Sequence, residues 1–333
     1  MQASAHPHPY SQLTPDHILD ALESVGLRGD GRLQALGSYE NRVYEVGVED
    51  GAPVVAKFYR PDRWADAAIA EEHEFVAELA ANEIPVVAPL PVAGRTLHAF
   101  GAFRFAVYPR CGGRAPELGG RSTSQWMGRF LGRIHAVGGT KAFEHRGSID
   151  IDRFGNEPRN WLLDHGFVPP DILDAWRSIT TLALDGIRRS YDRAGSVEYL
   201  RLHGDCHAGN VLWIERGDTQ GPHFVDFDDS RIGPAVQDLW MLLSGDHAEM
   251  TRQLADVLEG YRRFFDFDTR ELYLIEALRT LRLLHYSAWL AKRWDDPAFP
   301  AAFPWFNTQR YWQDRVLELR EQVALMDEPP LNP

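Results

Sequence analysis

The feature that most constrains the fold of this chain is a change of hydrophobic pattern near residue 110. Before it, short runs of alternating or β-branched residues predict strands, whereas after it apolar residues recur at helical spacing over long stretches. Residues 111–113 read Cys-Gly-Gly, a composition typical of a linker. We therefore predict an α+β protein with two lobes. Its β-rich N-terminal lobe spans residues 1–109, its hinge spans 110–115, and its larger helical C-terminal lobe spans 116–333.

The individual elements follow from the same periodicities. Thr14 and Pro15 predict the start of a helix that ends before Gly26. In the N-terminal lobe we expect strands at residues 33–36, 43–48, 53–59, 96–99 and 102–108, a hairpin turn at 49–51 and a helix at 66–82. In the C-terminal lobe we expect helices at residues 122–137, 170–192, 236–244, 250–265, 270–291 and 307–326, and a strand-rich insert at 199–227.

Composition and charge argue against several classes of protein. The formal net charge is −13, which opposes nucleic-acid binding because that binding depends on neutralising phosphates with Lys and Arg. No apolar run is long enough to span a membrane, and the N-terminus lacks the basic-then-apolar order of a signal peptide. We expect a cytoplasmic protein, a monomer, with neither nucleic acid nor membrane as a partner.

The two cysteines, Cys111 and Cys206, have no spacing that indicates a metal site or a disulfide framework. Oxidation of Cys206, which adjoins Asp205 in sequence, is one hypothesis for a switch that turns activity off. The favoured interpretation is that both are incidental reduced thiols.

The most informative segment is residues 202–213, which read LHGDCHAGNVLW. Asp205 and Asn210 have the Asp-x-x-x-x-Asn spacing of a kinase catalytic loop. A hydroxyl nucleophile must be oriented and must lose its proton, which requires a carboxylate such as Asp205. A metal ion that bridges nucleotide phosphates requires a hard oxygen ligand such as Asn210. The sequence therefore predicts a catalytic base and a metal ligand on one loop.

A second segment, residues 224–229, reads FVDFDD. It follows the first by one predicted hairpin, from residues 211–214 to residues 223–227. That hairpin is expected to bring Asp226 back beside Asn210. The two oxygen ligands would then form a Mg²⁺ site, completed by ATP phosphates and water.

The turn of this hairpin is expected to pass through Gly217 and Gly221. Two interpretations of Asp228 stay open: it adds a second carboxylate to the metal site, or it is a structural acid. Asp229 is expected to be structural, as the cap of a following turn.

Lys57 lies in the apolar run VVAKF at residues 54–58. Burying a lysine is unfavourable unless the ammonium has an anionic partner. A kinase supplies two such partners, the ATP phosphates and a glutamate on the following helix. Of the three glutamates in that helix we select Glu72. The alternative, a surface lysine on a half-exposed strand, would be favoured if Lys57 stood alone.

Further residues are candidates for contact with ATP. The turn at residues 37–43, GSYENRV, could offer backbone N–H groups to phosphates, and Ser38 is its best side-chain candidate. Tyr108 and Arg110 lie where the lobes join, so their backbone groups would meet the adenine. The sequence has neither GxGxxG nor GxxxxGK[ST], so neither a Rossmann nor a P-loop site is supported.

Two other functional classes, a metal-dependent hydrolase and a pseudokinase, are alternative interpretations of this sequence. His203 and His207 flank Asp205, and this H-x-D-x-H pattern is also compatible with a two-metal hydrolase that uses the later aspartates. Such a site has no role for Lys57 or Asn210, so we favour hydrogen-bonding support of the loop for both histidines. A nucleotide-binding pseudokinase would have lost the base or a metal ligand, and neither is lost here.

Three other features have weaker implications. Asp238 opens a predicted helix, where an acid complements the helix dipole, and is interpreted as structural. The aromatic residues toward the C-terminus are expected to be mostly core. Some of them could line a substrate site together with Arg282 and His285.

The H-G-D-x-H-x-x-N pattern at residues 203–210, with a later Asp, resembles the signature of the aminoglycoside/choline phosphotransferase group of kinase-like enzymes. The chain is more similar still to the bacterial stress response kinase A family. That resemblance is carried by residues 38–44 (SYENRVY), 57–61 (KFYRP), 202–213, 233–240 (GPAVQDLW) and 296–300 (DPAFP). These segments extend over nearly the whole chain.

The resemblance implies a two-lobed protein-kinase-like fold with an ATP cleft between the lobes. It also implies Ser/Thr protein kinase activity with ATP and Mg²⁺, including autophosphorylation, in bacterial envelope or oxidative stress responses. By position, Asp205 would be the proton acceptor, Asn210 and Asp226 the Mg²⁺ ligands, Asp226 also an active-site residue, and Ser38 a contact to ATP. Relatives in the wider group phosphorylate small molecules, so a small-molecule kinase of the aminoglycoside, choline or sugar-alcohol type remains the alternative.

Overall fold

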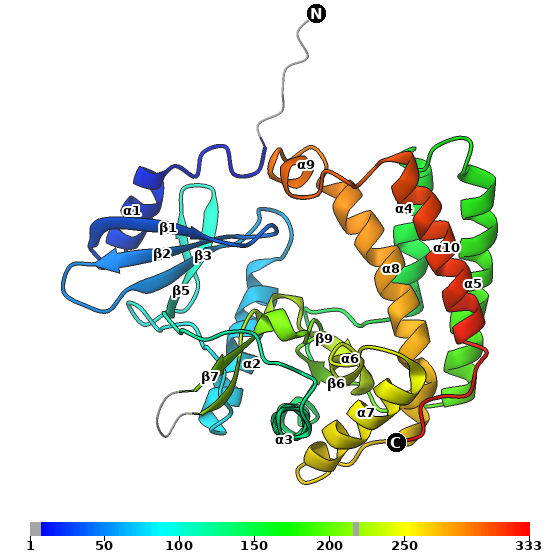
Figure 1. Cartoon of the computed structure of the whole chain (residues 1–333). Helices are drawn as coiled ribbons and strands as arrows, with labels where there is room; N and C mark the ends of the chain where they lie inside the picture. The colour runs from blue at the N-terminus through cyan, green and yellow to red at the C-terminus, as the bar shows by residue number, and fades with distance from the viewer. Residues whose placement is uncertain (1–7, 216–219) are drawn as a thin grey trace, which may run out of the picture. The chain divides into compact units, whose positions relative to one another are not determined.

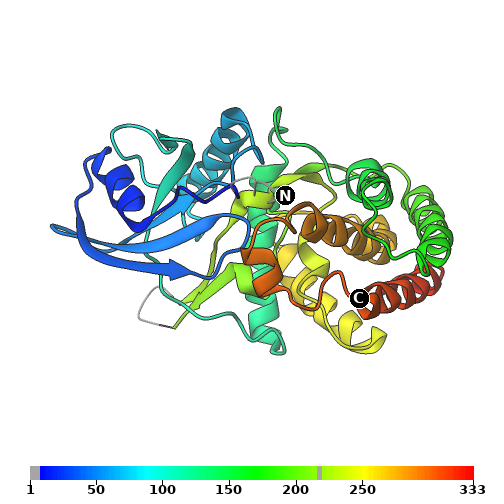
Figure 2. The same ribbon diagram turned by 90° about the horizontal axis from the view of Figure 1, so that it is seen from above.

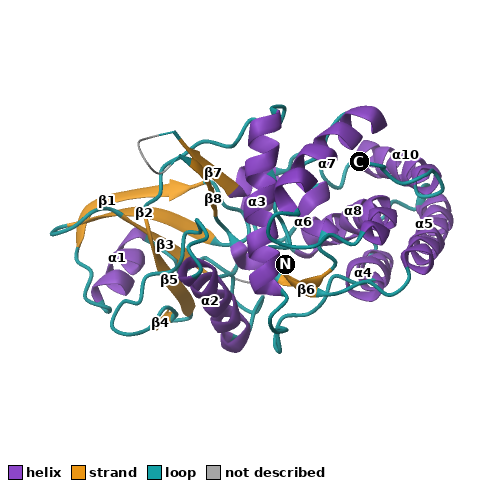
Figure 3. Cartoon of the chain, turned by 90° about the horizontal axis from the view of Figure 1, so that it is seen from below, coloured by secondary structure: helices purple, strands orange, loops and turns teal. Residues whose placement is uncertain are grey.

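The computed structural model describes residues 8–215 and 220–333. The chain forms two compact units, each built from segments that are distant in sequence (Figure 1). The first comprises Met1–Arg114, Leu212–Asp228 and Asp295–Ala298, and the second comprises Ala115–Val211, Asp229–Trp294 and Phe299–Pro333. In Figure 3 the large sheet belongs to the first unit, and the second unit is mainly helical. The α+β class predicted from the sequence is therefore confirmed.

A five-stranded antiparallel sheet in the order β1-β2-β3-β5-β4 is the body of the first unit. The strands are β1 (Gly29–Leu36), β2 (Arg42–Val48), β3 (Val54–Phe58), β4 (His98–Phe100) and β5 (Phe103–Pro109). All five are predicted by the sequence, but β1 begins at Gly29 rather than at residue 33. Its first residues pair with β2 across a register shift between Gly29 and Leu33, and such an irregularity breaks the two-residue alternation on which the prediction depends.

Two helices pack against this sheet. Helix α1 (Pro15–Glu23) begins as predicted, with the Thr14 hydroxyl accepting a hydrogen bond from the backbone N–H of His17. Its buried residues Ile18 and Leu22 join Phe58 in one apolar cluster, and each such side chain contributes roughly 2 kcal/mol on burial. Helix α2 (Asp66–Ala81) buries Glu72 on the same face as its apolar residues.

The predicted hairpin after residue 210 is present. Strands β7 (Val211–Ile214) and β8 (Gly221–Phe224) form a two-stranded sheet. Phe224 also pairs with the segment after α2, because its N–H donates to the Pro85 carbonyl (2.8 Å) and its carbonyl accepts from the Val87 N–H (3.0 Å). Of the two glycines expected in the turn, Gly221 begins β8, and Gly217 lies outside the described residues.

In the second unit, helix α3 (Arg121–Gly138) packs closely on α7 (His247–Tyr261). A Cβ atom on Gly128 would overlap the backbone oxygen of Val257, and one on Gly260 would overlap the oxygen of Gln125. Glycine is therefore required at both positions for the two backbones to approach. Figure 2 shows this helix pair from above.

Helices α5 (Leu173–Ala194), α8 (Ile275–Lys292) and α10 (Gln309–Leu325) pack on one another in the same unit (Figure 1). The rings of Trp176 on α5 and Trp312 on α10 meet edge to face at 5.2 Å and are fully buried. The described residues contain no helix that is both long enough and apolar enough to cross a membrane.

Several predicted helix boundaries were wrong. The helix expected at 236–244 is the shorter α6 (Val236–Trp240). The one expected at 250–265 is α7, which starts earlier because Asp246 and Glu249 form a reciprocal capping box. The one expected at 270–291 begins as a 3₁₀ turn (Thr269–Leu274) and becomes α8 only at Ile275.

Within the described part of the chain, two α-helices were not predicted. Helix α4 (Glu157–Asp164) contains Pro158, a residue that suggests a break, and it continues directly from a π-helical turn at Asp152–Asn156. The five-residue helix α9 (Ala298–Ala302) is too short to show a periodicity.

Candidate active site

Residues 203–210, here called the 203–210 loop, form a closed turn that follows strand β6 (Leu200–Leu202). The side-chain amide nitrogen of Asn210 donates to the Asp205 carbonyl at 2.9 Å, and the Asn210 backbone N–H donates to the His207 carbonyl at 2.9 Å. These bonds connect the two ends of the Asp-x-x-x-x-Asn motif. They also orient Asn210, since its amide nitrogen is occupied and its amide oxygen remains as an acceptor.

The carboxylate of Asp205 lies between two cationic or polar partners. Its Oδ1 accepts from Nη1 of Arg282 at 2.5 Å, and its Oδ2 lies 3.5 Å from Nε2 of His207. Burial acts to raise the pKa of Asp205, but the hydrogen bond with His207 and the charge of Arg282 outweigh it and hold the pKa well below its usual range. The carboxylate is therefore ionised at neutral pH, and 22% of the side chain is exposed.

The two histidines of the loop bond within the loop itself. His203 is fully buried, and its Nδ1 accepts from the Asp205 backbone N–H at 3.4 Å. Nδ1 of His207 accepts from the Gly209 N–H at 3.0 Å, which caps the 3₁₀ turn Ala208–Asn210. Both contacts agree with the supporting role that the sequence favours for these residues.

The sequence interprets Asp238 only as a helix-dipole residue, but in the structure it anchors the 203–210 loop. Its two carboxylate oxygens accept the backbone N–H groups of His203 and Gly204, each at 2.8 Å. The side chain is fully buried, and Oδ2 also lies 3.1 Å from Nε2 of His135. A neighbour on the same helix, Gln237, donates to the Gly204 carbonyl at 3.0 Å. Helix α6 therefore fixes the start of the loop through both backbone groups of Gly204.

Replacing Asp238 with Ala should lower the free energy of unfolding by about 2–4 kcal/mol, because two buried N–H donors would lose their acceptor. Phosphoryl-transfer activity should fall with it, since the loop that carries Asp205 loses its anchor. Chemical denaturation measures the first effect. The matched control is Asp256→Ala on α7, a surface aspartate that pairs with Arg121, which should change stability by less than about 1 kcal/mol.

A second buried acid supports α6 from the other side. The Glu271 carboxylate accepts from the Val236 N–H at 2.8 Å. Burial raises the pKa of Glu271 to about 8. In the unfolded chain this group loses its proton at a lower pH than in the folded protein. Its contribution to stability is therefore complete in acid and declines as pH rises from the unfolded pKa through about 8.

The Glu271→Gln variant should remove this pH dependence, because the amide oxygen still accepts from Val236 but does not ionise. Between about pH 6 and about pH 9 the melting temperature of the wild type should fall by more than that of the variant. Differential scanning calorimetry at several pH values measures this. Parallel curves for the two proteins would contradict the assignment.

In the first unit, Lys57 on β3 is the centre of an acidic cluster. Its buried ammonium lies 3.0 Å from Asp226 Oδ1, 3.3 Å from Asp228 Oδ1 and 3.9 Å from Glu72 Oε1. Burial acts to lower the pKa of Lys57, but the charges of Asp226, Asp228 and Glu72 outweigh it and raise the pKa well above its usual value. The predicted partner Glu72 is thus present, although two aspartates lie closer.

Asp228 has a structural position in this cluster. Its Oδ2 pairs with Nη1 of Arg63, its Oδ1 faces Lys57, and only 4% of its side chain is exposed. A carboxylate whose oxygens both face fixed cations is already neutralised. Of the two interpretations of Asp228 that the sequence left open, this geometry favours the structural acid.

Ion pairs continue from Arg63 to the turn between β1 and β2. Glu40 in that turn lies 3.8 Å from both Arg63 and Arg60. Arg60 pairs with the buried Asp296 at 3.0 Å, and Arg42 lies 3.4 Å from the same carboxylate. The segment Asp295–Ala298 is thereby tied to the sheet of the first unit. This network includes residues of three of the segments that carry the family resemblance.

The remaining predicted ATP contacts are also in the first unit. Ser38 lies in the turn between β1 and β2, and its hydroxyl donates to the Asn41 carbonyl at 3.1 Å. The Tyr108 hydroxyl is 3.2 Å from that of Tyr59, and Arg110 is exposed and pairs with Glu45 at 3.1 Å. The backbone groups assigned to ATP are at the end of β5 and just after it. Their contact with a nucleotide stays a prediction.

The predicted Mg²⁺ ligands have donor atoms of the right kind. Asp226 is 52% exposed, and its backbone has the left-handed φ of 59°, uncommon for a residue other than glycine and often found at functional sites. Asn210 offers its amide oxygen. A hard divalent cation prefers such oxygens, so the residues fit the ion. Within residues 8–215 and 220–333, no group of three or more His, Cys, Asp or Glu side chains is arranged to hold a metal. Asn210 belongs to the second unit and Asp226 to the first, and their joint use stays a prediction.

Neither cysteine has the properties of a reactive thiol. Cys206 is fully buried, and burial together with the charges of Asp238 and Asp205 raises the pKa of its thiol well above the usual value. Burial also raises the pKa of Cys111. Both thiols are therefore protonated at neutral pH, which argues against the oxidation hypothesis for Cys206.

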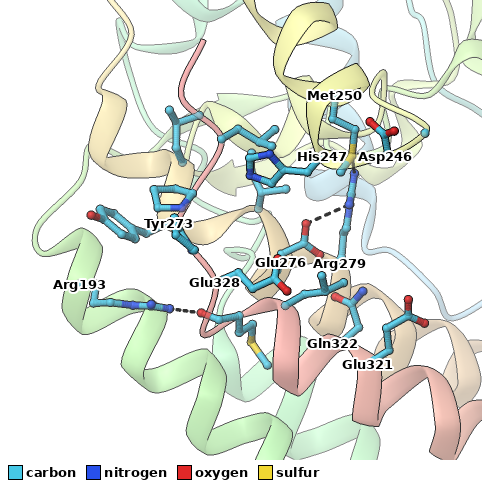
Figure 4. Close-up of a pocket in the computed structure, with 18 residues that line it drawn as sticks. Arg193, Asp246, His247, Met250, Tyr273, Glu276, Arg279, Glu321, Gln322 and Glu328 are labelled. Carbon is cyan, nitrogen blue, oxygen red and sulfur yellow. Dashed lines mark hydrogen bonds and ion pairs between the residues drawn. The ribbon is translucent and has the colours of Figure 1, made fainter.

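A pocket of about 410 Å³ lies elsewhere in the second unit, among α5, α7, α8, α10 and the C-terminal segment (Figure 4). Arg279 crosses it and pairs with Glu276 at 3.0 Å. Arg193 bonds to the Met326 carbonyl on another wall. None of the residues of the 203–210 loop lines this pocket.

Comparison with known proteins adds to this geometry. Residues 32–275 match a family described as "Phosphotransferase enzyme family". The chain is 45% identical over 323 residues to "Stress response kinase A" of Escherichia coli strain K12, which covers 97% of this chain and 96% of that protein. It is 44% identical, with the same coverage, to "Serine/threonine protein kinase RdoA" of Salmonella typhimurium strain LT2.

Solved structures share the fold at low sequence identity. An amicoumacin kinase in complex with AMP-PNP and Ca²⁺ superposes with a TM-score of 0.72 at 20% identity, covering 96% of this chain and 95% of that one. A microcompartment-associated aminopropanol kinase superposes with a TM-score of 0.72 at 18% identity, covering 94% and 97%. These similarities confirm the kinase-like fold that the sequence predicts.

Proposed function

Because the chain belongs to the phosphotransferase enzyme family and, within it, to the stress response kinase A family, we propose that it is a serine/threonine protein kinase. In this proposal it transfers the γ-phosphoryl group of ATP to protein hydroxyls, its own included, during a bacterial stress response. The proposal also places it in the cytoplasm as a monomer. The observation that carries it is the closed 203–210 loop, which presents an ionised Asp205 beside Asn210.

In this proposal, Asp205 is the base that acts on the hydroxyl group of the acceptor. Its carboxylate can accept a hydrogen bond from a Ser or Thr hydroxyl and orient an oxygen lone pair toward the γ-phosphorus. As the new O–P bond forms, the bond from the γ-phosphorus to the β-phosphate oxygen breaks and ADP leaves. The hydroxyl proton passes to Asp205. The buried Asp238 keeps the loop in place while these atoms move, since it holds two of the loop's backbone N–H groups.

On the nucleotide side, Lys57 would contact the α- and β-phosphates, held in position by Glu72 and the two aspartates. Ser38 would contact the phosphates from the turn between β1 and β2. Tyr108 and Arg110 would present backbone groups to the adenine. The lysine's raised pKa means that its charge persists at any pH at which the protein works.

Asn210 and Asp226 would hold Mg²⁺ against the phosphates through their side-chain oxygens. When bound, the ion neutralises charge on the β- and γ-phosphates. The contribution of the chain itself is the two side-chain oxygen ligands. Lys57, which pairs with Asp226 at 3.0 Å, orients that carboxylate.

The proposal is tested by following the γ-phosphate of labelled ATP with Mg²⁺ and the purified protein, with and without a generic protein substrate. We expect acid-stable label on Ser or Thr of the added protein and of the enzyme itself. A lack of label on protein, with ADP release that increases on adding sugars or choline-like alcohols, would overturn the protein-kinase proposal. ATP hydrolysis that persists without Asp205 would overturn the kinase mechanism as well.

A small-molecule kinase is the second candidate, because the amicoumacin and aminopropanol kinases share the fold. These two kinases are 18–20% identical to this chain. Similarity at that level shows a shared fold but does not show a shared substrate. The relatives that are 44–45% identical are named as stress response and serine/threonine protein kinases, so we place the protein substrate first.

A further inference from the structure

An arginine contacts the proposed catalytic base. Nη1 of Arg282, on α8, lies 2.5 Å from Oδ1 of Asp205. An acceptor hydroxyl must come within about 3 Å of the same carboxylate to lose its proton. The atoms next to that hydroxyl must therefore lie within a few ångströms of the guanidinium.

Arg282 has donors to offer to such a neighbour. A guanidinium has five N–H donors in a rigid fork that matches carboxylate and phosphate oxygens. One of these donors is directed to Asp205, and 41% of the Arg282 side chain is exposed. The arginine can therefore keep its bond to the base and still bind an anionic group on an acceptor.

Further arginines act on the residue one turn from Arg282, and one of them, Arg231, lies 4.0 Å from Asp229. One turn further along α8, the ring of His285 stacks on Phe154 at 4.4 Å, and the guanidinium of Arg231 lies over the same Phe154 ring at 5.2 Å. Burial, then the charges of Arg231, Arg293 and Arg282, lower the pKa of His285 to about 3, against the opposite effect of Asp229. Three arginine charges thus act on the His285 ring, which lies one helical turn from Arg282.

We propose that Arg282 selects acceptors in which a carboxylate or phosphate lies close to the reacting hydroxyl. The inference rests on the proposed protein kinase function, and its acceptor is then a Ser or Thr flanked by Asp, Glu or a phosphorylated residue. The charge of the partly exposed Arg282 is opposite in sign to the net charge of −13 of the whole chain. An exposed guanidinium beside a reacting group favours ligands of opposite charge.

The same geometry disfavours cationic acceptors. An amine next to the reacting hydroxyl would lie close to Arg282, and like charges in a partly buried site repel. Arg282 therefore supplies a physical criterion, independent of sequence identity, that separates an acidic peptide from an amine-bearing small alcohol as the acceptor.

The test uses the full chain with ATP and Mg²⁺ and three synthetic peptides that differ only around one serine, with acidic, neutral or basic flanks. The wild type should phosphorylate the acidic peptide with a kcat/KM at least about fivefold above that for the neutral one, and the basic peptide least well. Equal rates for the three peptides, or a preference for the basic one, would overturn the inference.

Variants of Arg282 distinguish a role in selecting the acceptor from a role in positioning Asp205. In Arg282→Gln the ratio of acidic to neutral kcat/KM should fall to near one, mainly through a higher KM for the acidic peptide, with the KM for ATP unchanged. Arg282→Lys, which keeps the charge, should retain part of the ratio. A uniform loss of kcat for all peptides with an unchanged ratio would mean that Arg282 only positions Asp205, and the inference would be wrong.

Arg279→Gln is the matched control. Arg279 is also on α8, one turn before Arg282, but it pairs with Glu276 in the pocket of Figure 4, which no residue of the 203–210 loop lines. This variant should keep the wild-type ratio. Thermal melting of all variants confirms that each is folded.

A second assay distinguishes failure of the protein kinase proposal from failure of the inference about Arg282. If no peptide is phosphorylated, the same enzymes are assayed with small hydroxyl compounds in pairs, one bearing a carboxylate or phosphate and one bearing an amine. Faster turnover of the anionic member, lost in Arg282→Gln, would support the selection by Arg282 although the protein substrate was wrong. Faster turnover of the amine would overturn both.

Discussion

The Asp205→Asn variant should lose phosphoryl transfer by a factor of about 10²–10⁴ in kcat, the usual contribution of a positioned acid or base. The amide has the shape of the carboxylate but cannot take the hydroxyl proton. The KM for ATP should change little, since the nucleotide contacts assigned to Lys57 do not involve this residue. Steady-state kinetics with the purified variant measure both quantities.

The control for this variant is Asp185→Asn on α5, the same change at an exposed aspartate that pairs with Arg188. It should have wild-type kinetics. The stability of Asp205→Asn should fall only modestly, because Arg282 and His207 lose an anionic partner that is itself partly exposed. If the variant retained more than about half of the wild-type kcat, another residue would have to be the base.

The Lys57→Met variant should have the largest effect on stability. Methionine has nearly the length of lysine, but its loss of charge leaves Glu72 and Asp228 buried and Asp226 half-exposed without their shared cation. Removing one partner of a buried ion pair typically costs about 3–5 kcal/mol, and Arg63 compensates only Asp228. Urea denaturation of the purified variant measures this loss, and ATP binding should be lost with it.

Lowering the pH should restore part of the stability of Lys57→Met. Carboxylates that face one another without a cation repel, and acid reduces that repulsion by neutralising carboxylates. The stability difference from the wild type should therefore narrow as pH falls toward about 5. The control is Lys292→Met, whose ammonium lies over the Trp161 ring and which should cost less than about 1 kcal/mol. A difference that does not change with pH would mean that packing, not charge, causes the loss.

The sequence predicts well those features that depend on neighbours along the chain. The spacing of Asp205 and Asn210 predicts a single loop, and a hydrogen bond from one to the other closes it. The strand-like apolar run at residues 53–59 predicts β3, and the apolar stripe of residues 66–82 predicts α2, which places Glu72 near Lys57. In each case the signal is local, because backbone geometry fixes which side chains share a face.

Contacts between distant segments were not predicted. Asp238 follows the loop by more than 30 residues and bonds to backbone N–H groups, which have no sequence signature of their own. The ion pair of Arg63 with Asp228 joins residues 165 positions apart. It bears on whether Asp228 contributes a carboxylate to the metal site. Sequence analysis had placed Arg282 and His285 near a substrate without giving either a partner.

By itself, the sequence determined the α+β class, the kinase family and the residue types of the site, since these follow from periodicity and motif spacing within short windows. Only the tertiary structure decided how those residues are charged and held. The pKa of Asp205 is lowered by a hydrogen bond with His207 in its own loop and by the charge of Arg282, 77 positions away, while Lys57 owes its charge to carboxylates on α2 and after β8. A side chain's pKa depends on its burial and on charges within a few ångströms. The fold, rather than the order of residues in the sequence, sets those distances.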